Sequence, residues 1–497
     1  MLKRILCLLT VTLLASTFVF SQVTTSSLTG TIKDASGEAL AGASVSATHQ
    51  PSGTKYSTLS QQNGQFTISN MRIGGPYLIE ITFVGHEPQK FDDIFLKLAE
   101  AFILDVNLRK TDATMENVII TTTNRSSILN ANRTGAVTNV TSRELQRLPS
   151  ITRSINDFTR LTPQANGTSI GGGNYRQNYI TVDGSDFNNT FGIGTNLPAG
   201  GSPISLDALD EISVNVTPYD IRQSGFIGSS VNAVTRSGTN RFQGSVYRYW
   251  RSEKQQGDEV NGVKFTRPPF EFEQYGARIG GPIIQNKLFF FVNYETENQP
   301  KVVQTRVATR TGVPVTPNTA RPTAADLDMI SNYLRTNYGY ETGPYDNYST
   351  EIERTKMLAR IDWNISDKHR FNIRYNQVEG GEPNPPSTST SGTGNSYAFG
   401  QGRTDQNAMW FKNSNYFQGA NFYSLAAELN SQFGSRFSNT FRGTYTLQDD
   451  SRESDSQDFP FVDILKDGTP YTSFGYELFS KGNLRKVKTY SFVDNLT

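Results

Sequence analysis

The chain changes character at the stretch SSVNAVTRSGTNRFQGSVYRYW, residues Ser229–Trp250. Its first part, in which Val231, Ala233 and Thr235 alternate with other side chains, predicts a short β-ribbon, and the Ser-Gly-Thr-Asn motif after it predicts a turn. A longer, aromatic strand is expected from Phe242. The residues before this stretch are glycine-rich and soluble in character, whereas those after it alternate aromatic and polar side chains. The stretch is therefore expected to be a domain boundary.

The composition limits the class of protein. A length of 497 residues predicts two to four structural units. Lys and Arg (47) balance Asp and Glu (46), so the charge gives no reason to expect a nucleic-acid partner. The 42 glycines, 31 phenylalanines and 22 tyrosines favour β-structure with many turns. A mean hydropathy of −0.47 is compatible with a β-barrel, because half of each strand faces an aqueous lumen.

Residues 1–22 have the features of a secretory signal peptide. Lys3 and Arg4 precede an apolar core at Ile5–Leu14, which is shorter than the roughly 20 residues that a transmembrane helix needs. The only cysteine, Cys7, lies in this core, so no disulfide is expected in the mature chain. The sequence therefore predicts an exported protein.

Residues 23–110 predict a small β-sandwich. Strands are expected at Leu28–Asp34, Ala43–Ala47 and Tyr77–Val84, and Asn63-Gly64 predicts a two-residue hairpin before Phe66. The segment resembles the carboxypeptidase regulatory-like, transthyretin-like domain, an accessory module rather than a catalyst. The matching residues are Gly30, Asp34, Gly37, Gly42, Ala43, Val45, Asn63, Gly64, Phe66, Gly75, Tyr77 and Gly85.

A zinc peptidase is the catalytic alternative for this segment, and the sequence argues against it. The three histidines, His49, His86 and His369, lack HExxH spacing. We therefore predict no enzyme activity, no cofactor and no metal site.

Residues 111–124 are expected to be a linker that contains the β-prone run MENVIITTT, Met115–Thr123. One interpretation is a simple edge strand. The other is a resemblance to the TonB box of outer-membrane transporters, which an energy-coupling protein captures by β-augmentation. That resemblance implies partner-binding residues, namely Glu116, Asn117, Val118, Ile119, Ile120 and Thr121.

Residues 125–237 predict an α+β domain. Thr141–Pro149 has a threonine cap with glutamate three residues later, and Ser154–Leu161 predicts a second short helix. Tyr179–Gly184 predicts a strand that ends in Asp-Gly, and Leu206–Val216 predicts a short helix that leads into a strand. This order of elements, which ends in the ribbon before residue 236, resembles the plug domain of TonB-dependent receptors.

Residues 238–497 predict membrane strands. In Met357–Asn364, apolar and polar side chains alternate, although a soluble antiparallel sheet does the same. The connections are more informative, because short and long ones alternate, as in outer-membrane barrels. The short ones are Ile284–Lys287, Ser366–Lys368 and Gly434–Arg436, and the long ones are near 299–353, 380–418 and 449–484. Arg321–Tyr333 predicts a helix inside the first long connection.

We count about eight strands, the last at Val487–Leu496. An eight-stranded barrel has an interior that its own side chains fill, whereas a plug needs a barrel near the 22-stranded size. An open sheet in lipid would leave strand edges unpaired. We therefore expect this sequence to be an N-terminal fragment of a longer protein.

The expected fold class is mainly β: a transthyretin-like sandwich, an α+β plug, and the first strands of a large, incomplete antiparallel barrel. The whole resembles the Oar-like branch of the TonB-dependent receptors. That resemblance implies import across the outer membrane, with the sandwich in the periplasm. The implied partners are a TonB-type energy-coupling protein, outer-membrane lipid, an unidentified ligand (iron chelate, glycan or peptide) and, as a candidate, a surface lipoprotein. The alternative is a surface protein for adhesion or for matrix or carbohydrate binding.

Overall fold

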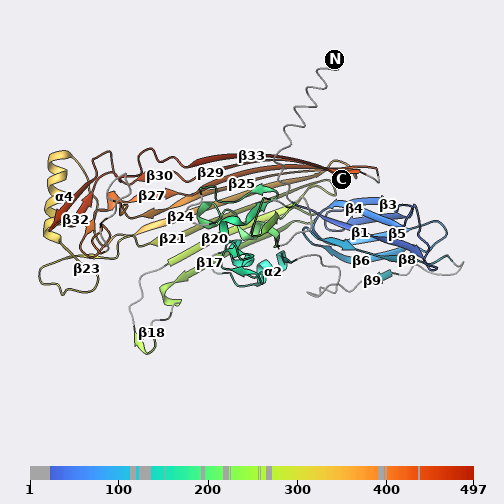
Figure 1. The fold of residues 1–497 in the computed structure, drawn as a ribbon, viewed down its shortest axis with the longest axis horizontal. Coiled ribbons are helices and arrows are strands. Elements are labelled where there is room, and N and C mark those ends of the chain that lie inside the picture. The colour runs from blue at the N-terminus through green and yellow to red at the C-terminus, as the bar shows by residue number, and fades with distance from the viewer. Residues whose placement is uncertain are drawn as a thin grey trace, which may run out of the picture.

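The computed structural model describes residues 23–111, 119–121, 136–150, 153–191, 196–216, 223, 225–255, 257, 259–264, 271–389, 397, 400–434 and 437–497. The expected signal peptide, residues 1–22, and Glu116–Val118 lie outside them. Figure 1 shows a small β-sandwich at one end of a long curved sheet, an α/β body beside the middle of the sheet, and loops with one helix at its other end. Within the described residues, no helix is long and apolar enough to cross a bilayer.

Two sheets form the sandwich. The first contains β1 (Ser26–Asp34), β4 (Gln65–Met71), β7 (Ala101–Ile103) and β8 (Val106–Leu108). The second has the order β3 (Thr54–Leu59), β2 (Ser44–His49), β5 (Gly74–Thr82), β6 (Gln89–Leu96) and β9 (Ile119–Thr121). Every second residue of β2 and β3 is buried, so each of these strands turns one face towards a common core. The expected sandwich is confirmed.

The turn at Asn63-Gly64 is not a hairpin, and that prediction is wrong. It joins β3 to β4, and these strands pair with β2 and β1 in different sheets. The Gly64 amide donates to the Gln61 carbonyl at 2.9 Å. The Gly64 carbonyl accepts from the Ile32 amide at 2.8 Å. The sequence identifies the turn, but the partner of each strand is chosen by packing across the core.

The α/β body is built on a sheet of order β10-β15-β16-β13-β14. Its strands are β10 (Val137–Thr141), β13 (Tyr179–Val182), β14 (Ser185–Asp186), β15 (Leu209–Asn215) and β16 (Ser230–Thr235). Around it lie α2 (Ser142–Arg147), α3 (Asn156–Thr159), the 3-10 turns η1 (Tyr175–Gln177), η2 (Ala199–Gly201) and η3 (Leu206–Ala208), and the pair β11 (Ala165–Asn166) and β12 (Ser169–Ile170). The central strand β16 is buried along its whole length. This is the expected α+β plug.

The predicted cap of the first helix is present. The amide and the hydroxyl of Thr141 donate to the Glu144 carboxylate at 2.8 and 2.9 Å. These bonds fix the point at which β10 ends and α2 begins.

Eight long strands form one antiparallel sheet, which is the wall of a barrel that remains open within the described residues. In order they are β17 (Gln243–Ser252), β20 (Glu271–Ile284), β21 (Leu288–Lys301), β24 (Thr350–Asn364), β25 (His369–Asn384), β28 (Asn421–Phe433), β29 (Phe437–Asp449) and β33 (Lys486–Leu496). Strands β17 and β33 are its two edges. The boundary stretch thus joins β16 of the plug to the first strand of the wall.

The two faces of the wall differ as expected of a membrane strand. Apolar side chains such as Val246 (85% exposed) and Phe492 (69%) point away from the plug, whereas Glu295 and Arg374 are fully buried on the plug side. Phe289 and Phe291, which break the sequence alternation, also lie on the plug side and are buried. Phe291 packs in the plug core, so the inner face is apolar where the plug covers it.

The connections alternate between short turns at the sandwich end and long loops at the other end (Figure 1). The predicted helix is α4 (Ala324–Tyr338), capped by the Thr323 hydroxyl and ended by Gly339. The loops also contain η4 (Glu253–Gln255), β18 (Glu259–Val260), β19 (Val263–Lys264), β22 (Val307–Thr309), β23 (Thr319–Thr323), β26 (Met409–Trp410), η5 (Lys412–Ser414), β27 (Tyr416–Gly419), β30 (Arg452–Ser454), β31 (Val462–Lys466) and β32 (Thr469–Phe474). Three long loops share an apolar core around Leu327, Phe411 and Phe474.

Candidate functional site

The plug meets the wall at the turn between β13 and β14. Asp183 and Gly184 occupy this two-residue turn with φ of 47° and 74°. Positive φ at both positions defines the type I′ turn that Asp-Gly favours, so the local sequence dictates this hairpin. A Cβ on Gly184 would lie 2.3 Å from the Arg442 guanidinium group, so a larger residue here would displace the Arg442 side chain.

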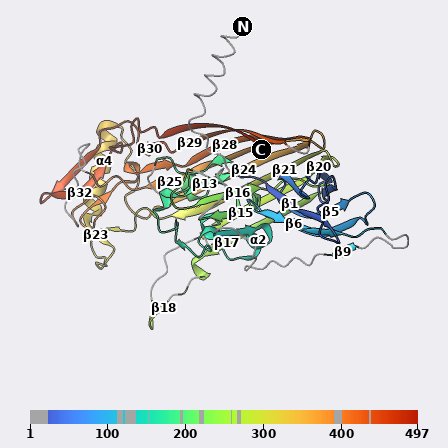
Figure 2. The same ribbon diagram turned by 45° about the vertical axis from the view of Figure 1, so that its right-hand side comes forward.

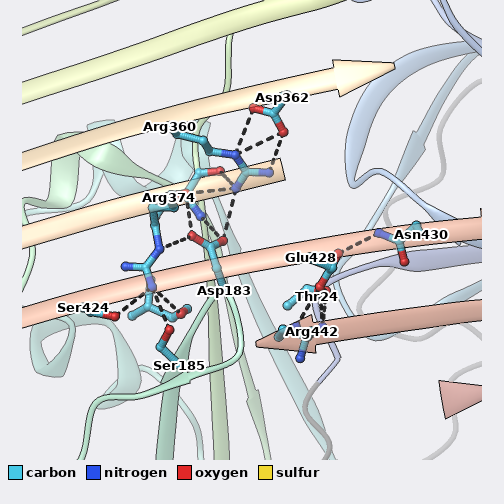
Figure 3. A network of polar contacts seen from close by, with 12 residues as sticks. Thr24, Asp183, Ser185, Arg360, Asp362, Arg374, Ser424, Glu428, Asn430 and Arg442 are labelled. Carbon is cyan, nitrogen blue, oxygen red and sulfur yellow. Dashed lines mark hydrogen bonds and ion pairs between the residues drawn. The ribbon is translucent and has the colours of Figure 1, made fainter. Parts of the chain in front are cut away.

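Asp183 is the centre of a buried ionic network (Figure 3). Its Oδ1 accepts from the Thr235 amide at 3.0 Å, and its Oδ2 accepts from the Thr235 hydroxyl at 2.7 Å. From the wall, Arg360 Nη1 lies 3.2 Å from Oδ1 and Arg374 Nε lies 3.0 Å from Oδ2. One plug carboxylate therefore joins the last strand of the plug sheet to two strands of the wall.

The two arginines have further partners. Arg374 Nη2 donates to the hydroxyls of Ser185 at 2.8 Å and Ser424 at 3.0 Å. Arg360 also pairs with Asp362 on its own strand, at 2.8 Å. We call Asp183, Thr235, Arg360, Asp362 and Arg374 the Asp183 cluster; it contains two guanidinium groups and two carboxylates, so its formal charges balance.

Burial by itself raises the pKa of Asp183, but the guanidinium groups of Arg360 and Arg374 and the Thr235 hydrogen bonds outweigh it and hold the pKa below its ordinary value. The carboxylate is therefore ionised at neutral pH. Buried ion pairs of this kind add little net stability when both partners are present. Removing one partner leaves an unpaired buried charge and lowers stability by about 3–5 kcal/mol. The cluster thus specifies one plug position.

A second polar contact lies on the neighbouring strands. Lys356 Nζ donates to Glu295 Oε1 and to the Ser202 hydroxyl of the plug, both at 2.7 Å. The Ser205 hydroxyl of the plug donates to Glu295 Oε2 at 2.9 Å. This ion pair belongs to the wall. The plug binds to it through the Ser202 and Ser205 hydroxyl groups, and Arg153 Nη2 of the plug lies 3.9 Å from Glu295 Oε2.

A third contact involves the segment that precedes the sandwich. Glu428 and Arg442 pair on adjacent wall strands, with Arg442 Nε 2.7 Å from Glu428 Oε2. The Thr24 hydroxyl donates to Glu428 at 2.9 Å and accepts from Arg442 at 2.7 Å (Figure 3). The lead into the sandwich is therefore attached to the inner wall.

An apolar part of the interface lies beside these groups. The rings of Phe187 on the plug and Phe422 on the wall meet edge to face, with centroids 4.7 Å apart. Phe291, Leu358 and Val378 of the wall share the same core with the plug sheet. The plug is thus held by a mixture of ionic, hydroxyl and aromatic contacts.

The predicted partner-binding segment is described only in part. Ile119–Thr121 form β9, whose backbone pairs in parallel with β6, with Lys90 opposite Ile119 and Asp92 opposite Thr121. Glu116, Asn117 and Val118 lie outside the described residues. The structure places the described part at the edge of a sandwich sheet and does not bring it to the Asp183 cluster.

Sequence reasoning did not select the residues of the Asp183 cluster. It identified Asp183-Gly184 as the end of a strand and Arg360 as one polar position in an alternating run. Arg360 could have indicated the cluster, because a charged side chain on the inner face and far from the strand ends needs a buried partner. The identity of that partner required the tertiary structure.

A family model described as an outer membrane beta barrel domain matches residues 234–497. The chain belongs to this family. A model of the carboxypeptidase regulatory-like domain matches residues 27–109, as the sequence predicted. The chain is 32% identical over 156 residues to the TonB-dependent transporter Oar of Myxococcus xanthus, a match that covers 29% of this chain and 14% of Oar.

Similar solved structures include the outer membrane transporter YddB from Escherichia coli, at 14% identity and a TM-score of 0.49, covering 73% of this chain and 45% of YddB. The siderophore receptor PirA from Acinetobacter baumannii matches at 15% identity and a TM-score of 0.38, covering 73% of this chain and 44% of PirA. The matched region is thus less than half of each of those chains. The barrel family places the chain in the outer membrane, and together with the Oar match it supports the expected TonB-dependent receptor. The expectation of further sequence stays a prediction.

Proposed function

We propose that the whole protein imports a ligand across the outer membrane, and that a TonB-type partner supplies the energy by pulling on Glu116–Thr121. The observation that carries this is the Asp183 cluster, which holds the plug to the wall through ions and hydroxyl groups. When the plug moves, water solvates the separated charges and hydroxyl groups and offsets part of the lost interaction, whereas a continuous apolar interface would expose its whole area without such compensation. The plug is therefore built to be displaced without unfolding the wall.

The domain division is part of this proposal: signal peptide 1–22, periplasmic sandwich 23–110, linker with the coupling segment 111–124, plug 125–237 and barrel 238–497. Capture of the segment would add a strand to the partner by β-augmentation. An iron chelate, a glycan or a peptide would bind at the long-loop end of the barrel. No catalytic step is required of any residue.

The test changes the coupling segment in the whole protein and measures growth on a panel of iron chelates, glycans and peptides as sole iron or carbon source. Deleting Glu116–Thr121 is expected to abolish growth on the transported class while the amount of receptor in the outer membrane stays unchanged. Ile120→Pro is the sharper variant, because proline removes a backbone donor from strand pairing. Ser126→Pro, outside the segment, is the matched control.

The competing function is adhesion by the three long loops of the wall. These loops share their own apolar core and lie at the end of the sheet opposite the sandwich. The same variants separate the two functions. An adhesion protein keeps surface attachment and growth after deletion of Glu116–Thr121, and unchanged growth on every nutrient would refute energy-coupled import.

A further inference from the structure

The sandwich is seated on the short-turn end of the wall, as Figure 2 shows. Strand β3 and the turn that precedes it touch the short-turn ends of several wall strands. Asn364 Nδ2 donates to the Thr54 hydroxyl at 3.0 Å, and Gln432 Nε2 donates to the Ser57 carbonyl at 3.0 Å. Arg370 lies over the Tyr56 ring, with its guanidinium carbon 3.8 Å from the centroid. We call these interactions the rim contact.

Gly53 makes the tightest approach in the rim contact. A Cβ placed on Gly53 would lie 2.0 Å from Oδ1 of Asn286, in the turn between β20 and β21. Gly53 also has a positive φ of 64°. Gly37, in a free turn of the same domain, has a φ of 88° and nothing within 4 Å of such a Cβ. The two glycines form a natural pair of test and control positions.

The sandwich also touches the plug. The Leu98 amide donates to Glu211 Oε1 of the plug at 2.9 Å. Ile73 and Leu98 of the sandwich pack against Val234 in β16. The seat of the sandwich is therefore made of both the wall and the plug, so a displaced plug cannot keep all of these contacts.

A small, partly open chamber of about 80 Å³ lies between the three bodies. The sandwich lines it with Thr54 and Tyr56, the plug with Asp183 and Thr235, and the wall with Arg360. The volume has room for a few water molecules. The docked sandwich thus covers one side of the chamber that borders the Asp183 cluster.

We propose that the sandwich is a periplasmic gate, which at rest covers the sandwich side of the chamber beside the Asp183 cluster and moves away when the plug is pulled. The second half of this statement rests on the proposed energy-coupled function. Opening would let water reach the buried ion pairs, and hydration of the separated charges would lower the cost of releasing the plug. Movement of the sandwich away from the wall would therefore make displacement of the plug easier.

The first test uses the purified whole receptor and needs no ligand. A cysteine at Asn372→Cys, on the wall of the chamber, is labelled with a hydrophilic maleimide in a Cys7→Ser background. Gly53→Asn forces a side chain into Asn286 and is expected to raise the labelling rate about tenfold or more, because that rate follows the open fraction. Gly37→Asn, the same substitution in open space, should leave the rate unchanged.

A second variant keeps the test decisive if asparagine at residue 53 is accommodated. Arg370→Ala with Gln432→Ala weakens the rim contact from the wall side and should also speed labelling. The proposal is overturned if both variants label at the rate of the Gly37→Asn control. It is also overturned if the parent labels as fast as a receptor with Ser36→Cys, which lies on the exposed surface of the sandwich.

The second test is made in cells and separates the gate from the energy coupling. Labelling of Asn372→Cys should be faster in energised cells than after addition of a protonophore, and deletion of Glu116–Thr121 should remove the difference. A gate that responds in the purified protein but not in energised cells would refute coupling-driven opening and leave the resting closure intact. No response in either test refutes the gate itself.

Discussion

The plug–wall contact and the sandwich–wall contact are both polar, but they differ in depth. Arg374 of the Asp183 cluster is fully buried, and its partner Asp183 is 5% exposed. In the rim contact, Thr54 and Tyr56 are buried, but Asn286, Lys55 and Ser57 lie at the surface, and two acceptors are backbone carbonyls. Buried charges specify one arrangement and are costly to separate, whereas surface hydrogen bonds are readily replaced by water. This difference fits the proposed order of events, in which the sandwich leaves the wall before the plug is displaced.

The largest effect is expected from Asp183→Ala, which breaks the deeper contact. It leaves Arg360 with one carboxylate and Arg374 with none, and should lower the free energy of plug unfolding by about 3–5 kcal/mol. The urea midpoint of plug unfolding, followed by trypsin accessibility, measures this. Asp458→Ala removes an ion pair in which both side chains are at least 70% exposed, and should change the midpoint little. Equal midpoints for the two variants would show that the cluster does not hold the plug.

A smaller effect, of opposite sign, is expected from Glu211→Gln at the sandwich–plug contact. Burial raises the pKa of Glu211 to about 8, with the Leu98 amide acting in the opposite direction. The native state thus binds the extra proton, so stability should be greatest below about pH 4.5 and fall as the pH rises to about 8. Glutamine keeps the acceptor without the charge.

Glu211→Gln should therefore stabilise the protein at pH 8 by on the order of 3 kcal/mol and flatten its pH dependence. Thermal unfolding of the purified protein between pH 5 and pH 8 gives the comparison. A variant that keeps the pH slope of the parent would show that Glu211 is not the responsible group.

Arg370→Ala should weaken only the rim contact. It removes the stacking on Tyr56 and a hydrogen bond to the Lys55 carbonyl, worth about 1–2 kcal/mol together. Hydrogen exchange should rise in β2 and β3 while the plug strands keep their protection. Equal loss of protection in the plug would mean that the two contacts form one cooperative unit.

The smallest effect is expected from Asn364→Ala, which removes the hydrogen bond to the Thr54 hydroxyl and a surface hydrogen bond to the Asn286 carbonyl, and costs about 1 kcal/mol in all. Combined with Arg370→Ala, its effect should be additive if the rim contact consists of independent bonds. A double-mutant cycle on the exchange of the sandwich amides measures the coupling. A coupling energy as large as the effects of the single substitutions would indicate that the rim contact forms cooperatively.

Much of the fold was predictable because local sequence patterns specify the strands, turns and helix caps. The alternating short and long connections predicted the wall, the Thr141 cap predicted α2, and the boundary at Ser229–Trp250 was found where β16 ends and β17 begins. Asn63-Gly64 was predicted wrongly as a hairpin, since a turn motif does not specify which sheet its strands join. Phe291 is an apolar residue on the inner face, and the tertiary structure explains it, because Phe291 packs in the plug core.

The sequence by itself determined the periodicities, the turns and the order of the domains, because these depend on residues near one another in the chain. It determined that Asp183 and Gly184 form a tight turn. Only the tertiary structure decided that this turn meets Arg360 and Arg374, and that Gly53 meets Asn286. Such contacts join residues far apart in sequence, and their partners are chosen by burial and charge balance across the whole fold.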